Sequence, residues 1–529
     1  MSLGLPQRAR FAQFDRRWLE PRALGALAVL AGFVGVLAWT ALNPLIPLVA
    51  LLLAIGAVVL IERPEWGLGL TFFVFYINLQ PVLSHDHGVS APLAALIPVV
   101  LVAPLLIRNF ILSHRSLGSH RLYLNGTTVW MGLYMLVLIA AAWSARDARA
   151  GFGGVLDFGI WGLAFYLLIL NSVRRESTLR QLVWALLAAG AFLSSISLFQ
   201  EATKAYHSTF GGFSPMLGSF LDAQTANWRP RPAGPVGDPN RYAQVLLVLV
   251  PLGLFRVSSE RGWLRWLAVG MTLLTVAGVL LTFSRGAGLA LALIFPVAGF
   301  LMKLKLKHMA LAAVLLLAMV SVAAPGFVAR MATLGGSATL INSQGSDTTD
   351  TADHSSRSRL TKNLAALHMF FDHPLIGVGP GNFGAYSNQY AEPVGESVDI
   401  VGSKAHNLVL GLIAETGVLG LLTFVGAVTA TLLNVWRVRR RAPAGSELLS
   451  LANGLFLALA AYGFSGIFLH LSYQRYFWIL MALAGTLPIM VREQERADAT
   501  AADAAAVPEA DQRANMLTPS RRSLAVGEL

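Results

Sequence analysis

The chain has 529 residues, of which 55% are hydrophobic and only 13% are charged, and it contains no cysteine. Uncharged apolar runs of about 20 residues recur along it, which is the pattern of a polytopic membrane protein. The lack of cysteine excludes disulfides and Cys-ligated metal. The net charge of +12 does not indicate nucleic acid, because membrane proteins concentrate Lys and Arg on cytoplasmic loops.

Apolar runs between polar breaks predict about 14 membrane-spanning helices. They begin near residues 23, 44, 66, 91, 126, 153, 179, 240, 263, 286, 308, 406, 449 and 475. We therefore predict an all-α polytopic membrane protein of about 12–14 transmembrane helices, with a large periplasmic loop that contains short helices. The first run follows several Arg residues, as in a signal peptide, but it lacks a small-residue cleavage site, so we predict that it is retained.

The positions of Lys and Arg predict that both termini face the cytoplasm. With the N-terminus inside, cytoplasmic segments hold 27 of the 40 Lys and Arg residues, in keeping with the positive-inside rule. The organisation predicted from this topology is a basic cytoplasmic start (1–22), N-terminal spans (23–200), a periplasmic loop (201–237), central spans (238–325), a large periplasmic loop (326–405), C-terminal spans (406–491) and a disordered cytoplasmic tail (492–529).

Three predicted helices begin on the outer side with polar residues. Asp238 is placed to cap a helix whose first residue is Pro239, and Arg231 lies just upstream. FSRGAG places Ser284 as a cap and Arg285 in the first turn of the second helix. The third helix opens with KAHN, residues 404–407. Each helix directs the positive end of its dipole at the outer membrane surface.

A cation beside a helix N-terminus has the wrong sign for the dipole, at a cost of about 0.3–1 kcal/mol at an exposed site. Arg231 and Arg285 therefore indicate an anion bound between them, and helix N-termini combined with guanidinium groups bind phosphate or pyrophosphate. The alternative is that each Arg extends to lipid headgroups. Three helix starts of the same orientation favour the binding site.

The large loop contains a segment with helical periodicity. Leu360, Leu364, Leu367 and Phe371 share one side of a predicted helix that Pro374 would end. This helix is predicted to lie on the outer membrane surface or to pack on other protein. GVGPGNF, residues 377–383, is glycine-rich, but it follows no predicted strand and faces a compartment without ATP. We predict a tight turn there and reject a nucleotide loop.

His406 is the residue in the KAHN segment most suited to chemistry. The positive helix end and the nearby Arg residues should lower its pKa, which would keep the imidazole neutral and able to accept a proton. A hydrogen-bonded structural role is the alternative. Glu415, nine residues further on, lies half a turn away on an ideal helix and is predicted to be structural. Gly417 and Gly420 are predicted to admit a neighbouring helix. His85 and His87 have no third ligand nearby, so no metal site is predicted.

The motif formed by His406, Asn407, Gly417 and Gly420 resembles the signature of the bacterial O-antigen ligase and O-antigen polymerase superfamily. The large loop before it, HPLIGVGPGNF, TFSRGAG and the 231–240 stretch are also similar to that family. The resemblance implies a glycosyltransferase of the bacterial inner membrane that works on the periplasmic side without metal or cofactor. It implies an undecaprenyl-diphosphate-linked glycan as the donor.

The resemblance also implies which residues act. His406 matches the family's essential histidine, and Arg231 and Arg285 are the best matches to its essential Arg pair. Alternatives for that pair are Arg229, Arg357 and Arg359, and Asn240 and Asn407 are further candidate substrate-binding residues. The hypothesis is that the Arg pair binds the diphosphate while His406 takes a proton from the attacking acceptor hydroxyl, with inversion at the anomeric carbon.

Three acceptors stay open within this reading: a lipid A core, another lipid-linked glycan, or a protein hydroxyl, as in a protein O-oligosaccharyltransferase. The rival from another class is a transporter or flippase of lipid-linked glycans, which the number of spans suggests. Against it, we find no paired interrupted helices in corresponding halves of the sequence. Membrane lipids are expected partners of either protein.

Overall fold

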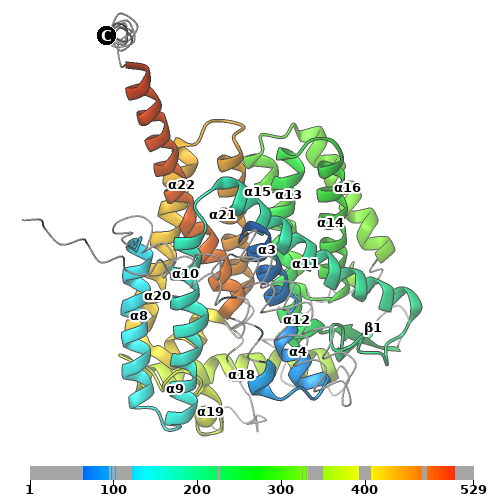
Figure 1. Ribbon diagram of the computed structural model, residues 1–529. Coiled ribbons are helices and arrows are strands. Elements are labelled where there is room, and N and C mark those ends of the chain that lie inside the picture. Colours follow the sequence, from blue (N-terminus) through cyan, green and yellow to red (C-terminus); the bar gives the residue numbers. More distant parts are fainter. Residues whose placement is uncertain are drawn as a thin grey trace, which may run out of the picture.

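The computed structural model describes residues 64–94, 97, 102, 122–222, 227–323, 326–328, 331, 350–391, 405, 407–467 and 474–506. Long helices dominate this part of the chain and lie side by side (Figure 1). The α-helices are α3 (Pro64–Tyr76), α4 (Leu79–Asp86), α5 (Ala91–Ala94), α8 (Gly126–Trp143), α9 (Ala148–Asp157), α10 (Phe165–Ser172), α11 (Glu176–Thr203), α12 (Pro239–Leu247), α13 (Leu249–Ser259), α14 (Gly262–Leu281), α15 (Arg285–Leu301), α16 (Leu306–Ala323), α18 (Asp350–Asp372), α19 (Phe383–Ala391), α20 (Leu408–Arg441), α21 (Glu447–Gly466) and α22 (Gln474–Ala506). A π-helix, η3 (Phe158–Ala164), joins α9 to α10, and a 3-10 turn, η4 (Gly234–Val236), precedes α12.

The described helices confirm a polytopic, all-α membrane protein. Eight are long and apolar enough to cross a membrane, and the bent pair α3–α4 makes up to nine. The eight correspond to spans predicted near residues 126, 153, 179, 240, 263, 406, 449 and 475, and the bent pair to the span predicted near 66. The shorter apolar helices α15 and α16 correspond to those predicted near 286 and 308. The predicted spans near 23 and 44 lie outside the described residues, and the span near 91 is described only in part.

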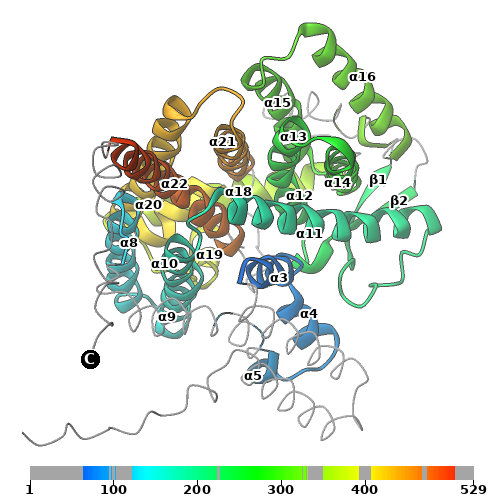
Figure 2. The same ribbon diagram turned by 45° about the horizontal axis from the view of Figure 1, so that its top comes forward.

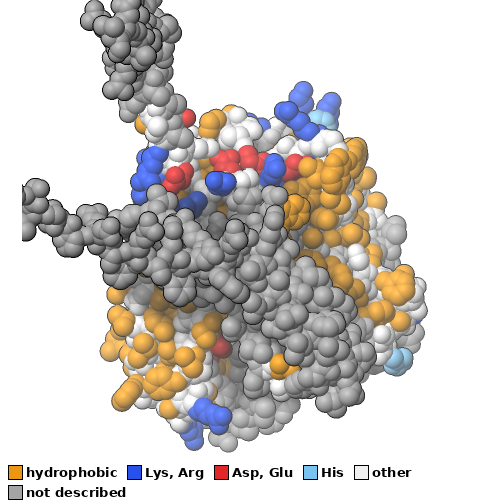
Figure 3. Space-filling model, in the orientation of Figure 1, with side chains coloured by type: hydrophobic (Ala, Val, Ile, Leu, Met, Phe, Trp, Pro, Cys, Tyr) orange, Lys and Arg blue, Asp and Glu red, His pale blue; other side chains and the backbone are white. Residues whose placement is uncertain are grey.

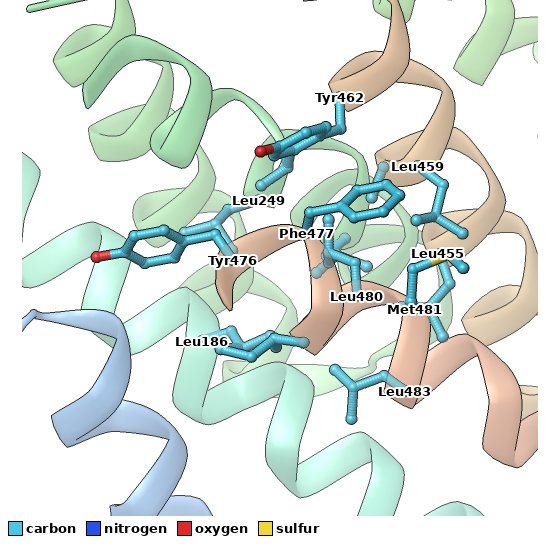
Figure 4. Packing of buried hydrophobic residues seen from close by; sticks show 14 of the residues in the cluster. Leu186, Leu249, Leu455, Leu459, Tyr462, Tyr476, Phe477, Leu480, Met481 and Leu483 are labelled. Atoms are coloured by element: carbon cyan, nitrogen blue, oxygen red, sulfur yellow. The ribbon is translucent and has the colours of Figure 1, made fainter. Parts of the chain in front are cut away.

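The core of the bundle lies around the first half of α22. Trp478, Leu480 and Met481 are fully buried there, and α22 packs against α10, α20 and α21. Figure 4 shows Phe477 of α22 below Tyr462 of α21, and the two ring centroids are 5.0 Å apart. The first half of α22 is therefore the central helix around which α10, α20 and α21 pack.

Charged and apolar side chains occupy different zones of the surface. Basic side chains lie along the top of Figure 3 with acidic ones among them, a smaller basic group lies at the bottom, and hydrophobic side chains cover the flanks between. The exposed basic side chains of the top end include Lys303, Lys305, Lys307, Arg437 and Arg440. We call it the basic end. The apolar zone beneath it is the surface expected to meet lipid tails.

Short elements close the opposite end of the bundle. Helix α18 runs there crosswise to the long helices, next to α19 (Figures 1 and 2). A two-stranded antiparallel hairpin, β1 (Met216–Asp222) with β2 (Asn227–Pro232), lies at the same end and was not predicted. The strands pair Met216 with Pro232 and Ser219 with Pro230, with an irregularity between Met216 and Ser219. We call this the α18 end.

Helix α18 confirms the predicted loop helix, and of its two predicted arrangements the stripe residues Leu360 and Phe371 do not show packing on other protein. It ends at Asp372, before Pro374, as predicted. Its buried side chains are Thr361, Ala365, Ala366 and Met369, which face α19 and α20. Leu360 and Phe371, both on the predicted apolar stripe, are exposed by 59% and 65%.

The C-terminal end of α22 also differs from the prediction. The tail expected to be disordered from residue 492 is helical as far as Ala506. The segment from Arg492 to Ala506 is rich in Ala, Glu, Arg and Asp, and Ala, Glu and Arg are strong helix formers. High helix propensity extends the helix beyond the last apolar turn, where the lack of apolar periodicity suggested none.

Candidate functional site

Arg231 connects three elements at the α18 end. Strand β2 carries it, and its side chain is only 8% exposed. Its Nε donates a hydrogen bond to the carbonyl oxygen of Thr282 at 2.7 Å. Its Nη2 donates to Oδ1 of Asn240 at 3.0 Å. Arg231 thus holds together the hairpin, the first turn of α12 and the turn between α14 and α15.

Asp238 caps α12, as predicted. Its Oδ1 accepts hydrogen bonds from the backbone N–H groups of Asn240 and Arg241, both at 2.9 Å. Pro239 is the first helical residue, where its missing N–H costs nothing. The cap fixes Asn240 in the first turn, within reach of Arg231.

The turn before α15 is tight and buried. Thr282, Phe283 and Ser284 are all less than 4% exposed. Phe283 has a φ of 52°, in the left-handed region that a non-glycine residue rarely adopts. Ser284 occupies the predicted N-cap position, but its side chain makes no capping bond. The hydroxyl of Thr282 instead accepts a hydrogen bond from the Ser284 N–H at 3.3 Å.

Arg359 and Arg285 lie close enough to affect each other. Burial lowers the pKa of the Arg359 guanidinium below its usual value, the positive charge of Arg285 lowers that pKa further, and the charge of Asp238 opposes both effects. Arg359 is carried by α18 and Arg285 opens α15, so the two interacting positive charges come from segments far apart in sequence. Like charges held together in a partly buried place repel, and a bound anion would offset that repulsion.

Arg229 and Arg231 have different partners, although both lie on β2. Arg229 lies two residues earlier on β2, and its Nη2 donates to Oε1 of Glu201 at 2.6 Å. Its guanidinium lies 4.7 Å from the centre of the Phe283 ring. Arg229 is therefore engaged with a carboxylate and an aromatic face, whereas Arg231 contacts Asn240 and the turn that precedes Arg285.

The start of α20 is described except for its candidate base. Ala405 is buried in a small cluster with Ala365, Ala366 and Met369 of α18, while His406 lies outside the described residues. Asn407 caps α20, because its Oδ1 accepts from the N–H groups of Val409 and Leu410. Its Nδ2 donates to the Ile467 carbonyl at 3.0 Å. These contacts give Asn407 a structural role, and its predicted contact with substrate stays a prediction.

Asn363 is a polar residue that sequence reasoning missed. It lies one turn beyond Arg359 on α18, and its side-chain oxygen is buried without a hydrogen-bond partner in the described part of the chain. Residues four apart lie on the same side of a helix, so the spacing from Arg359 was a signal that could have identified it. Arg357, the other predicted residue of this segment, has a side chain outside the described set.

The segment HPLIGVGPGNF is a structural connection. The N–H groups of Val378 and Gly379 donate to the carbonyls of Ala414 and Glu415 at 2.9 and 3.0 Å. In return, Val418 donates to the carbonyl of Pro374 at 2.8 Å. The predicted tight turn is confirmed, and it joins the loop to α20 along the backbone.

Asn382 anchors the other side of this segment. Its Oδ1 accepts from the N–H of Asp147 at 2.8 Å, and its Nδ2 donates to the Asp147 carbonyl at 3.0 Å. The loop is thereby attached to the turn between α8 and α9. With the bonds to α20, this attachment places the end of α18 firmly against two spanning helices.

Metal ligands do not gather in the described part of the chain. No group of three or more His, Asp or Glu residues there is arranged to hold a metal ion. Within the HxH pair, His87 uses Nε2 to contact the Gly211 carbonyl at 3.0 Å, and His85 lies 3.5 Å from the Asp86 carboxylate. His87 therefore helps to hold α4 against the segment that follows α11.

Comparison with models of protein families identifies part of the chain. Residues 270–425 match the model of the O-antigen ligase family. This range contains Arg285, Arg359, Asn407 and the connection between loop and α20, but Arg231 and Asn240 lie before it. No curated protein matches the chain.

Proposed function

We propose that the chain, of which residues 270–425 match the O-antigen ligase family, transfers a glycan from a lipid-linked diphosphate donor to an acceptor hydroxyl, as a ligase or a polymerase does. The observation that carries this proposal is the pair of hydrogen bonds by which the buried Arg231 joins Asn240 to the turn before Arg285, together with the effect of the Arg285 and Asp238 charges on the pKa of Arg359. A diphosphate is the anion whose charge and geometry suit several guanidinium groups at once.

The donor's leaving group is the lipid diphosphate. As the bond between the anomeric carbon and the diphosphate oxygen breaks, that oxygen takes the electron pair and gains negative charge. Arg285 and Arg359 would stabilise this charge more strongly in the transition state than in the bound donor, and only such a difference accelerates the step. Arg231 would bind the diphosphate with them and hold their surroundings in place.

The acceptor hydroxyl attacks from the opposite side of the sugar. A new bond forms between the acceptor oxygen and the anomeric carbon, and the hydroxyl proton passes to a general base. We assign that base to His406, whose neighbours in the sequence are the buried Ala405 and the cap residue Asn407. One direct displacement inverts the anomeric configuration. Asn363 offers a hydrogen-bond acceptor for a hydroxyl of the bound glycan.

The site is proposed to face the periplasm. On the described helices, the clusters Lys303–Lys307 and Arg437–Arg441 lie at the end opposite α18. The positive-inside rule then assigns the basic end to the cytoplasm and the α18 end to the outside of the inner membrane.

The decisive experiment uses the purified full-length protein. It is incubated with a defined undecaprenyl-diphosphate glycan and, separately, with lipid A core, a second lipid-linked glycan or an acceptor protein, without metal or nucleotide. We expect one acceptor to become glycosylated with inverted configuration. His406→Ala should abolish transfer, whereas His373→Ala, which changes an exposed histidine of the same end, should not.

A cellular assay separates this proposal from the transporter. In cells that carry His406→Ala, lipid-linked donor should still reach the outer leaflet and accumulate there. Failure of the donor to appear on that side, with no transfer by the purified wild-type protein, would favour a transporter.

A further inference from the structure

Helix α18 carries large apolar side chains on the side turned away from the protein. Leu360 and Phe371 are 59% and 65% exposed. They are eleven residues apart, which is about three helical turns, so they share one side of the helix. The buried side, which faces α19 and α20, has small or slender residues such as Ala365, Ala366 and Met369.

The geometry of α20 places α18 relative to the membrane. A hydrocarbon core of about 30 Å takes roughly 20 helical residues. Counting back that far from Arg437, which begins the basic cluster, leads to Gly417, where α20 has a non-helical φ of 63°. Between them α20 exposes Leu419, Leu422 and Val425. The break at Gly417 therefore marks the membrane boundary at the α18 end.

The residues that follow α18 are attached at this boundary. The N–H of Leu419 donates to the carbonyl of Leu375 at 3.2 Å, and the Leu375 side chain is 63% exposed. On the neighbouring helix, Trp143 at the end of α8 is 80% exposed, the position of an interfacial tryptophan. The exposed apolar side of α18 thus continues the lipid-facing surface of α20 through Leu375.

We propose that α18 lies in the membrane interface, with Leu360, Phe371 and Leu375 among the acyl chains of the lipid leaflet at the α18 end. The partner of this surface is the bilayer itself. Arg359 lies on a neighbouring side of the same helix, partly buried beside Arg285. It would then lie at headgroup depth, where the diphosphate of a membrane-bound donor also lies. This last step rests on the proposed function.

The natural lack of cysteine makes the proposal simple to test. Leu360→Cys, Phe371→Cys and Leu375→Cys are each labelled with a nitroxide in the full chain, in phosphatidylethanolamine–phosphatidylglycerol vesicles. Collision with oxygen, which concentrates in lipid, is compared with collision with a water-soluble nickel chelate. Leu422→Cys on α20 provides the lipid reference, and Asp372→Cys, an exposed polar position at the end of α18, provides the water reference.

We expect the three labels to resemble the Leu422 reference, with at least a fivefold higher ratio of oxygen to nickel accessibility than the Asp372 label. A ratio equal to that of Asp372 would place the side in water and overturn the proposal. Labels that are immobile, reached by neither reagent and coupled between copies would assign the surface to a second chain, which also overturns it. The Leu360, Phe371, Leu375 and Leu422 variants must each keep the wild-type unfolding midpoint, whereas Asp372→Cys also loses the hydrogen bond from Tyr390.

The same surface has a kinetic signature. Leu360→Ser and Phe371→Ser should raise the KM for an undecaprenyl-linked donor several-fold and leave that for a water-soluble short-chain donor unchanged. Equal effects on both donors would contradict a membrane role for α18. Because the accessibility measurement does not depend on transfer, it stands even if the proposed reaction is wrong.

Discussion

Gly377 and Gly417 lie back to back where the loop after α18 crosses α20. A Cβ atom on Gly377 would overlap the backbone between Ala414 and Thr416, and one on Gly417 would overlap the backbone of Leu375 and Ile376. Both glycines also have positive φ angles, 69° and 63°. The backbone of each segment occupies the space that a side chain on the glycine of the other segment would fill.

We expect Gly417→Ala and Gly377→Ala each to lower the free energy of unfolding by about 1–3 kcal/mol, from backbone strain and steric overlap. Thermal unfolding in detergent measures the change. Gly270→Ala is the matched control, since nothing lies within 4 Å of the added methyl group and α14 is regular there. An unfolding midpoint of Gly417→Ala equal to that of Gly270→Ala would contradict the close crossing.

Arg285→Lys and Arg359→Lys keep the charge but lose the planar fork that binds two phosphate oxygens together. We expect kcat/KM for the lipid-linked donor to fall about tenfold or more in each, equivalent to about 1.4 kcal/mol. The measurement is the initial rate of transfer at limiting donor. Arg149→Lys, an exposed Arg in α9, should retain full activity. Undiminished rates in both site variants would rule out diphosphate binding by these residues.

Tyr390 predicts an alkaline loss of stability at the α18 end. Burial and the hydrogen bond from its hydroxyl to the Asp372 carboxylate at 2.6 Å raise the pKa of Tyr390 to about 12. The folded state therefore favours the protonated phenol. This contribution is fully present below about pH 10, the ordinary tyrosine value, and is lost as the pH rises toward 12.

The stability difference between wild type and Tyr390→Phe should follow that titration. It should be constant below pH 10 and should then change between pH 10 and 12, as wild type loses stability relative to the variant. Denaturant unfolding across this range measures it. A difference that stays constant up to pH 12 would show that Tyr390 ionises as easily when the protein is folded.

The buried ion pair at the basic end should be structural. Arg256 is 1% exposed and donates to both Glu447 of α21 and Glu260. Glu447→Gln leaves the Arg256 charge less well compensated, so we expect a loss of about 1–3 kcal/mol in unfolding free energy. Donor affinity should not change. Glu495→Gln removes an exposed partner of Arg441 and should cost less than about 1 kcal/mol.

Hydrophobic runs predicted the described spans well because lipid imposes a strong rule on composition. The helices beginning at Gly126, Glu176, Gly262 and Glu447 lie within four residues of their predicted starts. The α12 cap was predictable because Asp238 and Pro239 act on their immediate neighbours. Local signals of this kind depend little on the rest of the fold.

The packed side of α18 could not be predicted in the same way. In water, a stripe of Leu and Phe indicates the buried side of a helix. Near a bilayer the large residues can face lipid, while small ones such as Ala365 and Ala366 allow helices to pack closely. Hydrophobic periodicity alone cannot distinguish these two arrangements.

Long-range relations were the other part that the sequence did not reveal. Arg231 reaches the Thr282 carbonyl, 51 residues away, and the charge of Arg285 affects the pKa of Arg359 on a different helix. The break in α20 at Gly417 was also not predicted. The motif resemblance suggested that Arg231, Arg285 and His406 belong to one site. Only the tertiary fold shows that Arg359 lies near Arg285.

The joint between the loop and α20 is made of peptide groups. Apart from its glycines, the joint does not require particular side chains, because almost every residue supplies the same backbone N–H and carbonyl groups. Relatives could replace most residues of this joint and still build the same platform for the arginines. Distant members of such a family should therefore be easier to recognise from paired glycines in the loop and in the helix than from overall sequence identity.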